Sequence, residues 1–137
     1  ILNLSSNEVK DRVRESLLEV GMSGNEKKMP SELSGGMKKR VGIARAIAIR
    51  PRYMFYDEPT TGLDPIMTDS INKLISNFHN THDVTSIIVT HEMKVVRDVS
   101  ERVIMLHDCG IKYDGGNEGL LNSDNSIIKN FVIGKSN

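Results

Sequence analysis

Residues 53–58 read Tyr-Met-Phe-Tyr-Asp-Glu, a short apolar and aromatic run that stops abruptly at two acids. A run of this kind is typical of a strand that is buried on both faces of a parallel sheet. Residues 86–89, Ser-Ile-Ile-Val, predict a second buried strand. Because α/β folds bind ligands at the carboxyl ends of their strands, Asp57 and Glu58 are expected at the ligand-binding edge of the sheet.

Helical spacing of apolar residues surrounds these two strands. It predicts one helix over 6–20, capped by Ser6 or Asn7 and ended by Gly21, and another over 34–48. The remaining expectations are a loop over 22–32, helices over 66–80 and 92–99, strands over 102–107 and 111–114, and a polar tail from 117 with one apolar cluster over 127–133. Alternating helices and buried strands predict an α/β fold with parallel strands and right-handed crossovers.

The composition excludes several classes of protein. The chain has 137 residues, which suit one domain or part of one, with 18 Lys and Arg against 18 Asp and Glu. A neutral chain has no overall field that attracts nucleic acid or a membrane surface. No apolar run approaches the roughly 20 residues of a bilayer-spanning helix. The single cysteine, Cys109, excludes an internal disulfide and fits a reducing compartment.

Residues 33–37 read Leu-Ser-Gly-Gly-Met and are followed by three cations. A capping serine and two glycines expose backbone N–H groups at the positive end of a helix, which is an arrangement that binds anions. For Ser-Gly-Gly taken alone, a flexible turn is the alternative. The wider stretch 33–56 has six cations and no acid. We interpret them mostly as the solvated side of an amphipathic helix, with proximity to a bound phosphate and a nucleic-acid surface as alternatives. A nucleic-acid surface would interleave exposed aromatic residues or have a wider basic face.

Three side chains are candidates for chemistry at the edge of the sheet. Asp57 would orient a Mg2+ ion directly or through water, and Glu58 could polarise a water molecule as a general base. His91 follows the second strand and would reach the same edge. Each residue has a plainer interpretation, since strand ends often carry solvated acids and a lone histidine is usually structural. The other histidines lack matching carboxylate or cysteine spacing, so no zinc site is predicted.

These motifs occur in one order along the chain, and that order resembles the ATP-binding subunit of ABC transporters. The run 33–37 is similar to the signature motif, and 53–57 to the Walker B strand, with Glu58 at the catalytic-glutamate position. Residues 61–64, Thr-Gly-Leu-Asp, resemble the D-loop, and His91 resembles the switch histidine. The resemblance runs over 6–134. It implies a partial P-loop NTPase fold of the α/β class, with the end of the helical subdomain and the Walker B half of the core sheet.

The resemblance also implies a substrate and partners. In this family two subunits face head to tail, and each ATP lies between the P-loop of one and the signature of the other. Ser34, Gly35 and Gly36 would therefore contact the γ-phosphate of ATP held by a second ATP-binding subunit. Transmembrane permease subunits would be the other partners. They would attach the protein to the cytoplasmic side of the inner or plasma membrane, and no nucleic-acid partner is expected.

The same resemblance assigns roles to four further residues. Asp57 would help to coordinate Mg2+, and Glu58 would orient the attacking water. His91 would contact the γ-phosphate or that water. Asp64, in the D-loop, would link the two ATP sites across the dimer. The full-length protein would accordingly be an ATPase.

A finer resemblance is to the ATPases of MCE-type phospholipid transporters, which include the organic-solvent-resistance class. It rests on Met37 where most signatures carry Gln, on the runs 40–48 and 62–66, and on the ending 130–134. It implies that the protein energises phospholipid transport between membranes. The alternatives are an ATPase of another transport system, and a degenerate, non-catalytic remnant that only binds a partner.

A phosphate-binding P-loop, Gly-x-x-x-x-Gly-Lys-[Ser/Thr], is not found in the sequence. Residues 134–136 read Gly-Lys-Ser, but Lys129 stands where the pattern needs glycine. The family's glutamine loop is not identifiable either, and the first residue is Ile1 rather than Met. We therefore expect a fragment that begins inside the helical subdomain and that binds ATP weakly or not at all by itself. The predicted domain parts are the helical subdomain and signature helix over 1–50, catalytic core elements over 51–116 and a carboxyl-terminal tail over 117–137.

Overall fold

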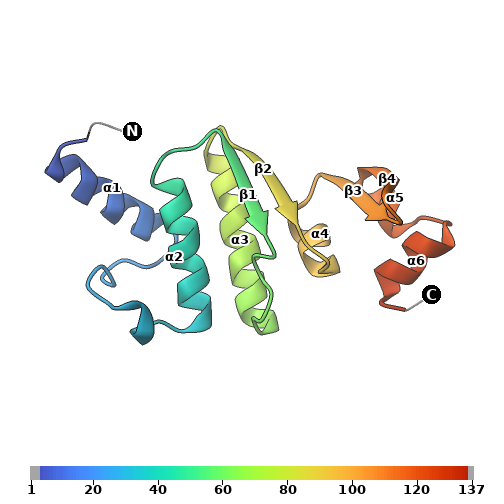
Figure 1. The fold of residues 1–137 in the computed structure, drawn as a ribbon, viewed down its shortest axis with the longest axis horizontal. Helices are drawn as coiled ribbons and strands as arrows, with labels where there is room; N and C mark the ends of the chain where they lie inside the picture. Colours follow the sequence, from blue (N-terminus) through green and yellow to red (C-terminus); the bar gives the residue numbers. More distant parts are fainter. Residues whose placement is uncertain (1–3, 136–137) are drawn as a thin grey trace. The chain divides into compact units, whose positions relative to one another are not determined.

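The structure is a computed structural model that describes residues 4–135. The chain forms two compact units, Ile1–Val89 and Thr90–Asn137. The first unit carries the elements from α1 to β2 and the second those from α4 to α6 (Figure 1). Within the described range, no helix is both long and apolar enough to cross a membrane. The three-part division predicted from the sequence stays a prediction.

Helix α1 spans Ser6–Glu19 and begins at a capping box. The Ser5 backbone N–H donates to Glu8 Oε2 at 2.7 Å, and the Glu8 N–H donates to Ser5 Oγ at 3.4 Å. These hydrogen bonds to Ser5 hold the pKa of Glu8 below its usual value. The predicted cap, Ser6 or Asn7, is therefore wrong by one or two residues, because Glu8 completes the box only with Ser5. Gly21, at φ +68°, ends the helix as predicted.

Helix α2 spans Gly35–Ile47 and follows a short 3₁₀ turn, η1, at Pro30–Glu32. Ile43 and Ala44 lie on its buried side together with its last residue. Arg40 joins this helix to its neighbours, since its guanidinium donates to the Val20 carbonyl and to Ser70 Oγ, both at 2.5 Å. Arg40 is therefore not on the solvated side of the helix, as the sequence suggested, but between helices.

The predicted parallel pair of strands is confirmed. Strand β1 spans Tyr53–Asp57, helix α3 spans Pro65–Thr81, and strand β2 spans Thr85–Val89. The two strands pair in parallel over their whole length, so that the last residue of β1 lies opposite the last residue of β2. A helix that connects two parallel strands is the βαβ unit expected for an α/β fold. The arrangement brings the ends of both strands to one edge (Figure 1).

The two faces of this sheet differ in burial. Met54 and Tyr56 on β1 are buried, as are Ile71 and Ile75 on α3. The alternate residues form an apolar face that is between 46% and 73% exposed: Tyr53, Phe55, Ile87 and Val89. The expectation of strands buried on both faces is therefore wrong for the described residues. Only one side of the two-stranded sheet is packed, and the residues of each strand alternate between the two sides.

The second unit consists of an antiparallel hairpin and short helices. Its elements are α4 (Met93–Val99), β3 (Arg102–His107), β4 (Gly110–Gly116), α5 (Asn117–Leu121) and α6 (Ser126–Ile133). Met105, Leu120 and Ile128 form its core. The tail, predicted to be polar with one apolar cluster over 127–133, contains the helices α5 and α6. Ile128 of that cluster lies in this core, as does Leu120 of α5, which the prediction did not include.

Candidate functional site

The predicted anion-binding turn forms the start of α2. Ser34 is the N-cap, with φ −65° and ψ 167°, and its Oγ accepts the Met37 N–H at 3.3 Å. Ser34 and Gly35 are exposed, whereas Gly36 is buried. Since a helix N-terminus leaves backbone N–H groups without intrahelical partners, this exposed end can accept a negatively charged group.

The two glycines of this turn differ in what surrounds them. A Cβ atom at Gly36 would lie 2.0 Å from the Met67 Cε atom on α3, so a larger residue would force that flexible side-chain end to move. A Cβ atom at Gly35 would lie 4.0 Å from Leu63 Cδ2, which is an ordinary contact. Gly36 therefore permits close packing of α3 beneath the turn, while Gly35 keeps the outer surface of the turn open.

Asp57 is the last residue of β1 and is exposed. In the part of the chain that the structure describes, its carboxylate has no hydrogen bond or ion pair. That same part holds no group of three or more His, Cys, Asp or Glu residues arranged for a metal. A single open carboxylate fits Mg2+, which takes one or two protein carboxylates and completes its shell with water and substrate phosphates. Beside it, burial raises the pKa of the Tyr56 hydroxyl.

Glu58 follows in an unusual backbone conformation, with φ +45°. This left-handed region costs a residue other than glycine about 1–2 kcal/mol, so contacts elsewhere must hold it. The Glu58 N–H donates to the Val89 carbonyl at the end of β2, at 2.9 Å. Its carbonyl accepts a hydrogen bond from Lys39 Nζ on α2 at 3.0 Å. Its carboxylate accepts one from the Thr61 hydroxyl, also at 3.0 Å.

Sequence reasoning missed both Lys39 and Thr61 as neighbours of Glu58. The sequence places Lys39 on the solvated basic face, and its position 19 residues before Glu58 gives no local signal. Thr61 lies inside the D-loop resemblance, and its spacing of three residues from Glu58 is a usable signal for a side-chain hydrogen bond across a turn. Lys38 and Arg45, by contrast, are exposed as predicted for that face.

Asp64, the D-loop candidate, is the N-cap of α3. Its Oδ1 atom accepts the N–H groups of Ile66 and Met67, both at 2.9 Å. Gly62, two residues earlier, takes φ +80° in the turn. The cap and the proline at the first position of the helix account for the sharp start of α3. Asp64 therefore has a structural role in its own chain, in addition to the role predicted between subunits.

His91 is exposed and lies between β2 and α4, and it belongs to the second unit. The backbone after it is turned by Thr90, whose Oγ1 accepts the Glu92 N–H at 3.0 Å. The structure thus brings Ser34, Asp57, Glu58 and Asp64 into one unit, and the reach of His91 to the phosphate stays a prediction.

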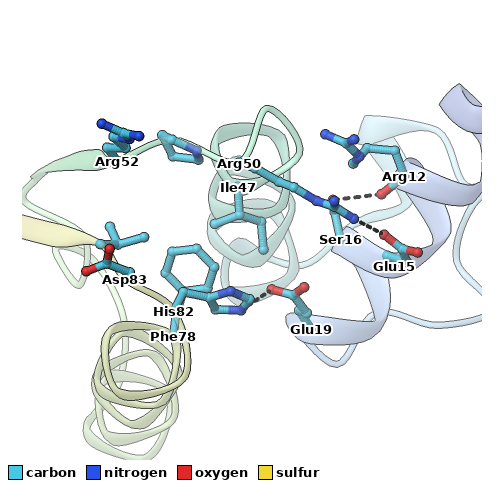
Figure 2. Close-up of a pocket in the computed structure, with 12 residues that line it drawn as sticks. Arg12, Glu15, Ser16, Glu19, Ile47, Arg50, Arg52, Phe78, His82 and Asp83 are labelled. Atoms are coloured by element: carbon cyan, nitrogen blue, oxygen red, sulfur yellow. Dashed lines mark hydrogen bonds and ion pairs between the residues drawn. The ribbon is translucent and has the colours of Figure 1, made fainter. Parts of the chain in front are cut away.

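A cavity of about 310 Å3 lies at the other end of α2, between α1 and the carboxyl-terminal ends of α2 and α3 (Figure 2). Figure 2 shows Arg50 extended to Glu15, with which it forms an ion pair of 3.1 Å, and His82 extended to Glu19, with Nε2 at 3.3 Å from Oε2. Arg52, just before β1, also lines it. The cavity is therefore at the amino-terminal edge of the strands, and none of the predicted site residues borders it.

The chain is similar in sequence to proteins of known families. The ABC transporter family model matches residues 2–61. A protein of Mycobacterium tuberculosis named a probable ribonucleotide transport ATP-binding protein, mkl, is 41% identical over 128 residues, which are 93% of this chain and 36% of the relative. Relatives of 40–42% identity are named for amino-acid transport and methionine import. The chain spans less than half the length of these relatives.

Two solved structures with the same fold align with most of this chain. The protein cbiO1 of Clostridium perfringens, part of the ABC transporter complex cbiONQ, matches with a TM-score of 0.82 and 29% identity, covering 94% of this chain and 51% of that one. A dimeric ATP-binding cassette in a post-hydrolysis state, bound to ADP and Pi, matches with a TM-score of 0.71 and 31% identity, over 85% of this chain and 50% of that one. The chain thus has part of an ABC ATPase fold, as predicted.

Proposed function

We propose that the protein to which this chain belongs hydrolyses ATP as the ATP-binding subunit of an ABC transporter. The observation that carries the proposal is the end of β1, where an exposed Asp57 without a described partner is followed by Glu58 in a tightly held turn. Phosphoryl transfer depends on positioning and on charge neutralisation more than on covalent chemistry. The held carboxylate of Glu58 can position a reactant, and the exposed carboxylate of Asp57 can bind a cation that neutralises charge.

Each acid has its own part in this proposal. Asp57 would hold Mg2+ together with phosphate oxygens and water, and the bound ion would neutralise the charge on the phosphates. The Glu58 carboxylate would orient the attacking water and take up its proton. The Thr61 hydroxyl, which donates to Glu58 Oε2, keeps that carboxylate in one orientation. His91 would contact the γ-phosphate or the water.

The start of α2 would act on ATP held by a second subunit. The Ser34 oxygen caps the Met37 N–H, which leaves the serine's own O–H proton free to be donated to a phosphate oxygen. The exposed Gly35 would add its backbone N–H, and the buried Gly36 would keep the turn close to α3. Asp64 would link the two sites of a head-to-tail dimer. The dimeric state of the cassette bound to ADP and Pi supports this assembly.

The partners in the membrane follow from the same proposal. Because cbiO1 is part of an ABC transporter complex, we expect permease subunits as further partners of this protein. They would hold it at the cytoplasmic side of the inner or plasma membrane. No nucleic-acid partner is included, since Arg40 and Lys39 are bonded within the first unit and are not displayed for a polyanion.

The cargo is a finer proposal. Met37 and the runs 40–48, 62–66 and 130–134 resemble the ATPases of MCE-type phospholipid transporters, and this resemblance supports phospholipid as the cargo. The relatives are named for ribonucleotides, amino acids and methionine, and those names favour another transport system as the alternative. Vesicles that contain the complete transporter decide between them: ATP-dependent movement of labelled phospholipid supports the first cargo, and uptake of one of the other compounds supports the second.

Steady-state ATP hydrolysis tests the ATPase proposal. The assay compares this chain alone with the chain extended upstream to include a P-loop, and with the extended chain carrying Glu58→Gln. We expect activity only in the extended form and a loss of at least about 100-fold with Glu58→Gln, since a positioned general base contributes 10²–10⁴-fold. No activity in either form would contradict the proposal and favour a remnant that only binds a partner.

A further inference from the structure

A single side chain connects the anion-binding start of α2 with the turn that holds Glu58. Lys39 lies five positions after the Ser34 cap on the same helix, and its side chain is partly buried. The ammonium group donates to the Glu58 carbonyl oxygen at 3.0 Å. Since α2 is a continuous helix over Gly35–Ile47, its first turn and Lys39 move together as one body.

This hydrogen bond acts where the local backbone gives little support. The φ of +45° at Glu58 is disfavoured for a residue with a side chain. Within the turn, the Thr61 N–H approaches the same carbonyl only at 3.4 Å, which is long for a hydrogen bond. The Lys39 donor is charged, and charge-assisted hydrogen bonds are shorter and stronger than neutral ones. Lys39 is therefore the stronger anchor of the Glu58 carbonyl.

Two further anchors of Glu58 act on groups other than this carbonyl. The bond from the Glu58 N–H to Val89 fixes the amide on the amino-terminal side, and the bond from Thr61 Oγ1 fixes the carboxylate. The orientation of the peptide after Glu58 sets the path of the chain into Pro59 and Thr60, both of which are buried. Loss of the ammonium group would thus weaken the hold on the turn on its carboxyl-terminal side.

We propose that Lys39 is a positioning residue through which the signature helix fixes the backbone of Glu58. The proposal rests on the proposed function for the roles of Ser34 and Glu58. A phosphate that binds at the start of α2 would hold this helix in place, and Lys39 would pass that constraint to the water-orienting glutamate of the same subunit. Engagement of one ATP site would thereby favour the active conformation of the other.

The neighbouring lysine provides a matched control. Lys38 has the same charge and the same helical environment, but it is exposed and makes no side-chain hydrogen bond or ion pair in the described residues. The test compares Lys39→Met, Lys39→Arg and Lys38→Met in the intact protein. Methionine keeps the unbranched stem of lysine and removes the donor, whereas arginine keeps a donor.

Two measurements are made on each variant. The first is hydrogen exchange of the backbone amides over 58–63, which we expect to be about tenfold faster in Lys39→Met, because local opening becomes easier. The second is ATP turnover, in which we expect kcat to fall about tenfold while KM for ATP changes less than about twofold, since the proposed role of Lys39 is exerted through the Glu58 backbone. Lys39→Arg should restore most of both, and Lys38→Met should match the unmodified protein.

The outcomes separate this proposal from the proposed function. Unchanged exchange in Lys39→Met, or equal effects of Lys38→Met, would overturn the positioning role whatever the turnover. Faster exchange in Lys39→Met alone, with an unchanged kcat, would also overturn it, because the bond would then be merely structural. If the unmodified protein hydrolyses no ATP, the proposed function fails, and the exchange measurement alone then decides whether Lys39 fixes the Glu58 backbone.

Discussion

The turn that follows β1 and the turn that joins β3 to β4 place residues other than glycine at positive φ, for different reasons. In the hairpin, Asp108 and Cys109 have φ of +47° and +57° and form a two-residue connection between His107 and Gly110. Two-residue hairpins favour positive φ at both central positions, because this backbone twist matches that of the strands. The conformation there is a local requirement of the hairpin.

The turn after β1 has no such local requirement. Glu58 follows a strand of a parallel pair, and the chain goes on into a helix, not into an adjacent antiparallel strand. Its φ of +45° is held by Val89 and Lys39, which lie 31 positions after it and 19 before it. The comparison teaches that one backbone conformation can come from adjacent residues or from distant ones, and that the second kind is concentrated at functional sites.

The largest expected effect beyond the proposals comes from Thr61. Thr61→Val keeps the shape of the side chain and removes the hydroxyl that donates to Glu58 Oε2. We expect kcat for ATP to fall about tenfold, which corresponds to about 1.4 kcal/mol, because the carboxylate loses its orientation. Thr61→Ser retains the donor and is the control. Equal turnover of the two variants would show that this hydrogen bond does not position Glu58.

A smaller effect isolates the backbone strain at Glu58. Glu58→Gly and Glu58→Ala both remove the carboxylate, but only glycine adopts φ +45° without strain. We expect the glycine variant to be more stable than the alanine variant by about 1 kcal/mol, after the greater entropy of the unfolded glycine chain is subtracted. Urea unfolding of the intact protein measures the difference. A more stable alanine variant would mean that the turn relaxes away from this conformation.

The hairpin provides the corresponding substitution. Cys109→Gly produces Asp-Gly, a pair preferred in this kind of turn, and relieves the positive φ of Cys109. We expect a gain of about 0.5 kcal/mol, because the strain relieved only slightly exceeds the added unfolded-state entropy. The same unfolding assay applies, with Cys109→Ser as the control for loss of the thiol. A loss of stability would indicate that the thiol itself makes a contact of value.

The smallest expected effect concerns the ion pair across the same hairpin. Arg102 donates from Nε and Nη2 to the Asp114 carboxylate at 2.7 and 2.8 Å, and these bonds hold the pKa of Asp114 below its usual value. A lowered folded-state pKa stabilises the protein above the unfolded pKa, and this contribution is lost as the pH falls through the folded value. Asp114→Asn should therefore flatten the acid limb of the stability curve slightly, because both groups are exposed and screened. An unchanged acid limb would assign the stabilisation to other carboxylates.

Much of the fold follows from patterns that adjacent residues create. Helical periodicity and turn residues placed α1, α2, α3 and the strands within a few positions, since these patterns depend on neighbours in the chain. The cap of α1 was displaced by one residue because the partner of Ser5 is Glu8, and several serines and asparagines compete for that place. Helix α5 was missed, because a helix of five residues forms by docking Leu120 into a core and is too short for a periodic pattern. Helix α6 was missed although its apolar residues at 127, 128, 131 and 132 have helical spacing, because they were interpreted as an apolar cluster within a polar tail.

The candidate site likewise contains residues that local sequence predicts and residues whose contacts it does not predict. The types and order of Ser34, Asp57, Glu58 and Asp64 were readable, because each follows a strand or begins a helix that local pattern predicts. The roles of the cations were not readable. Lys39 and Arg40 look like surface residues in a basic stretch, yet they bond to Glu58, Val20 and Ser70 in other elements.

The sequence by itself determined the α/β pattern, the order of the motifs and the placement of two acids after a strand, because all of these depend on residues close together in the chain. Only the tertiary structure decided which face of the sheet is buried, and which distant groups hold Glu58. The physical reason is that burial and side-chain hydrogen bonds depend on the elements that pack together. A lysine and a carbonyl 19 positions apart become partners only when the helix and the strand between them have docked.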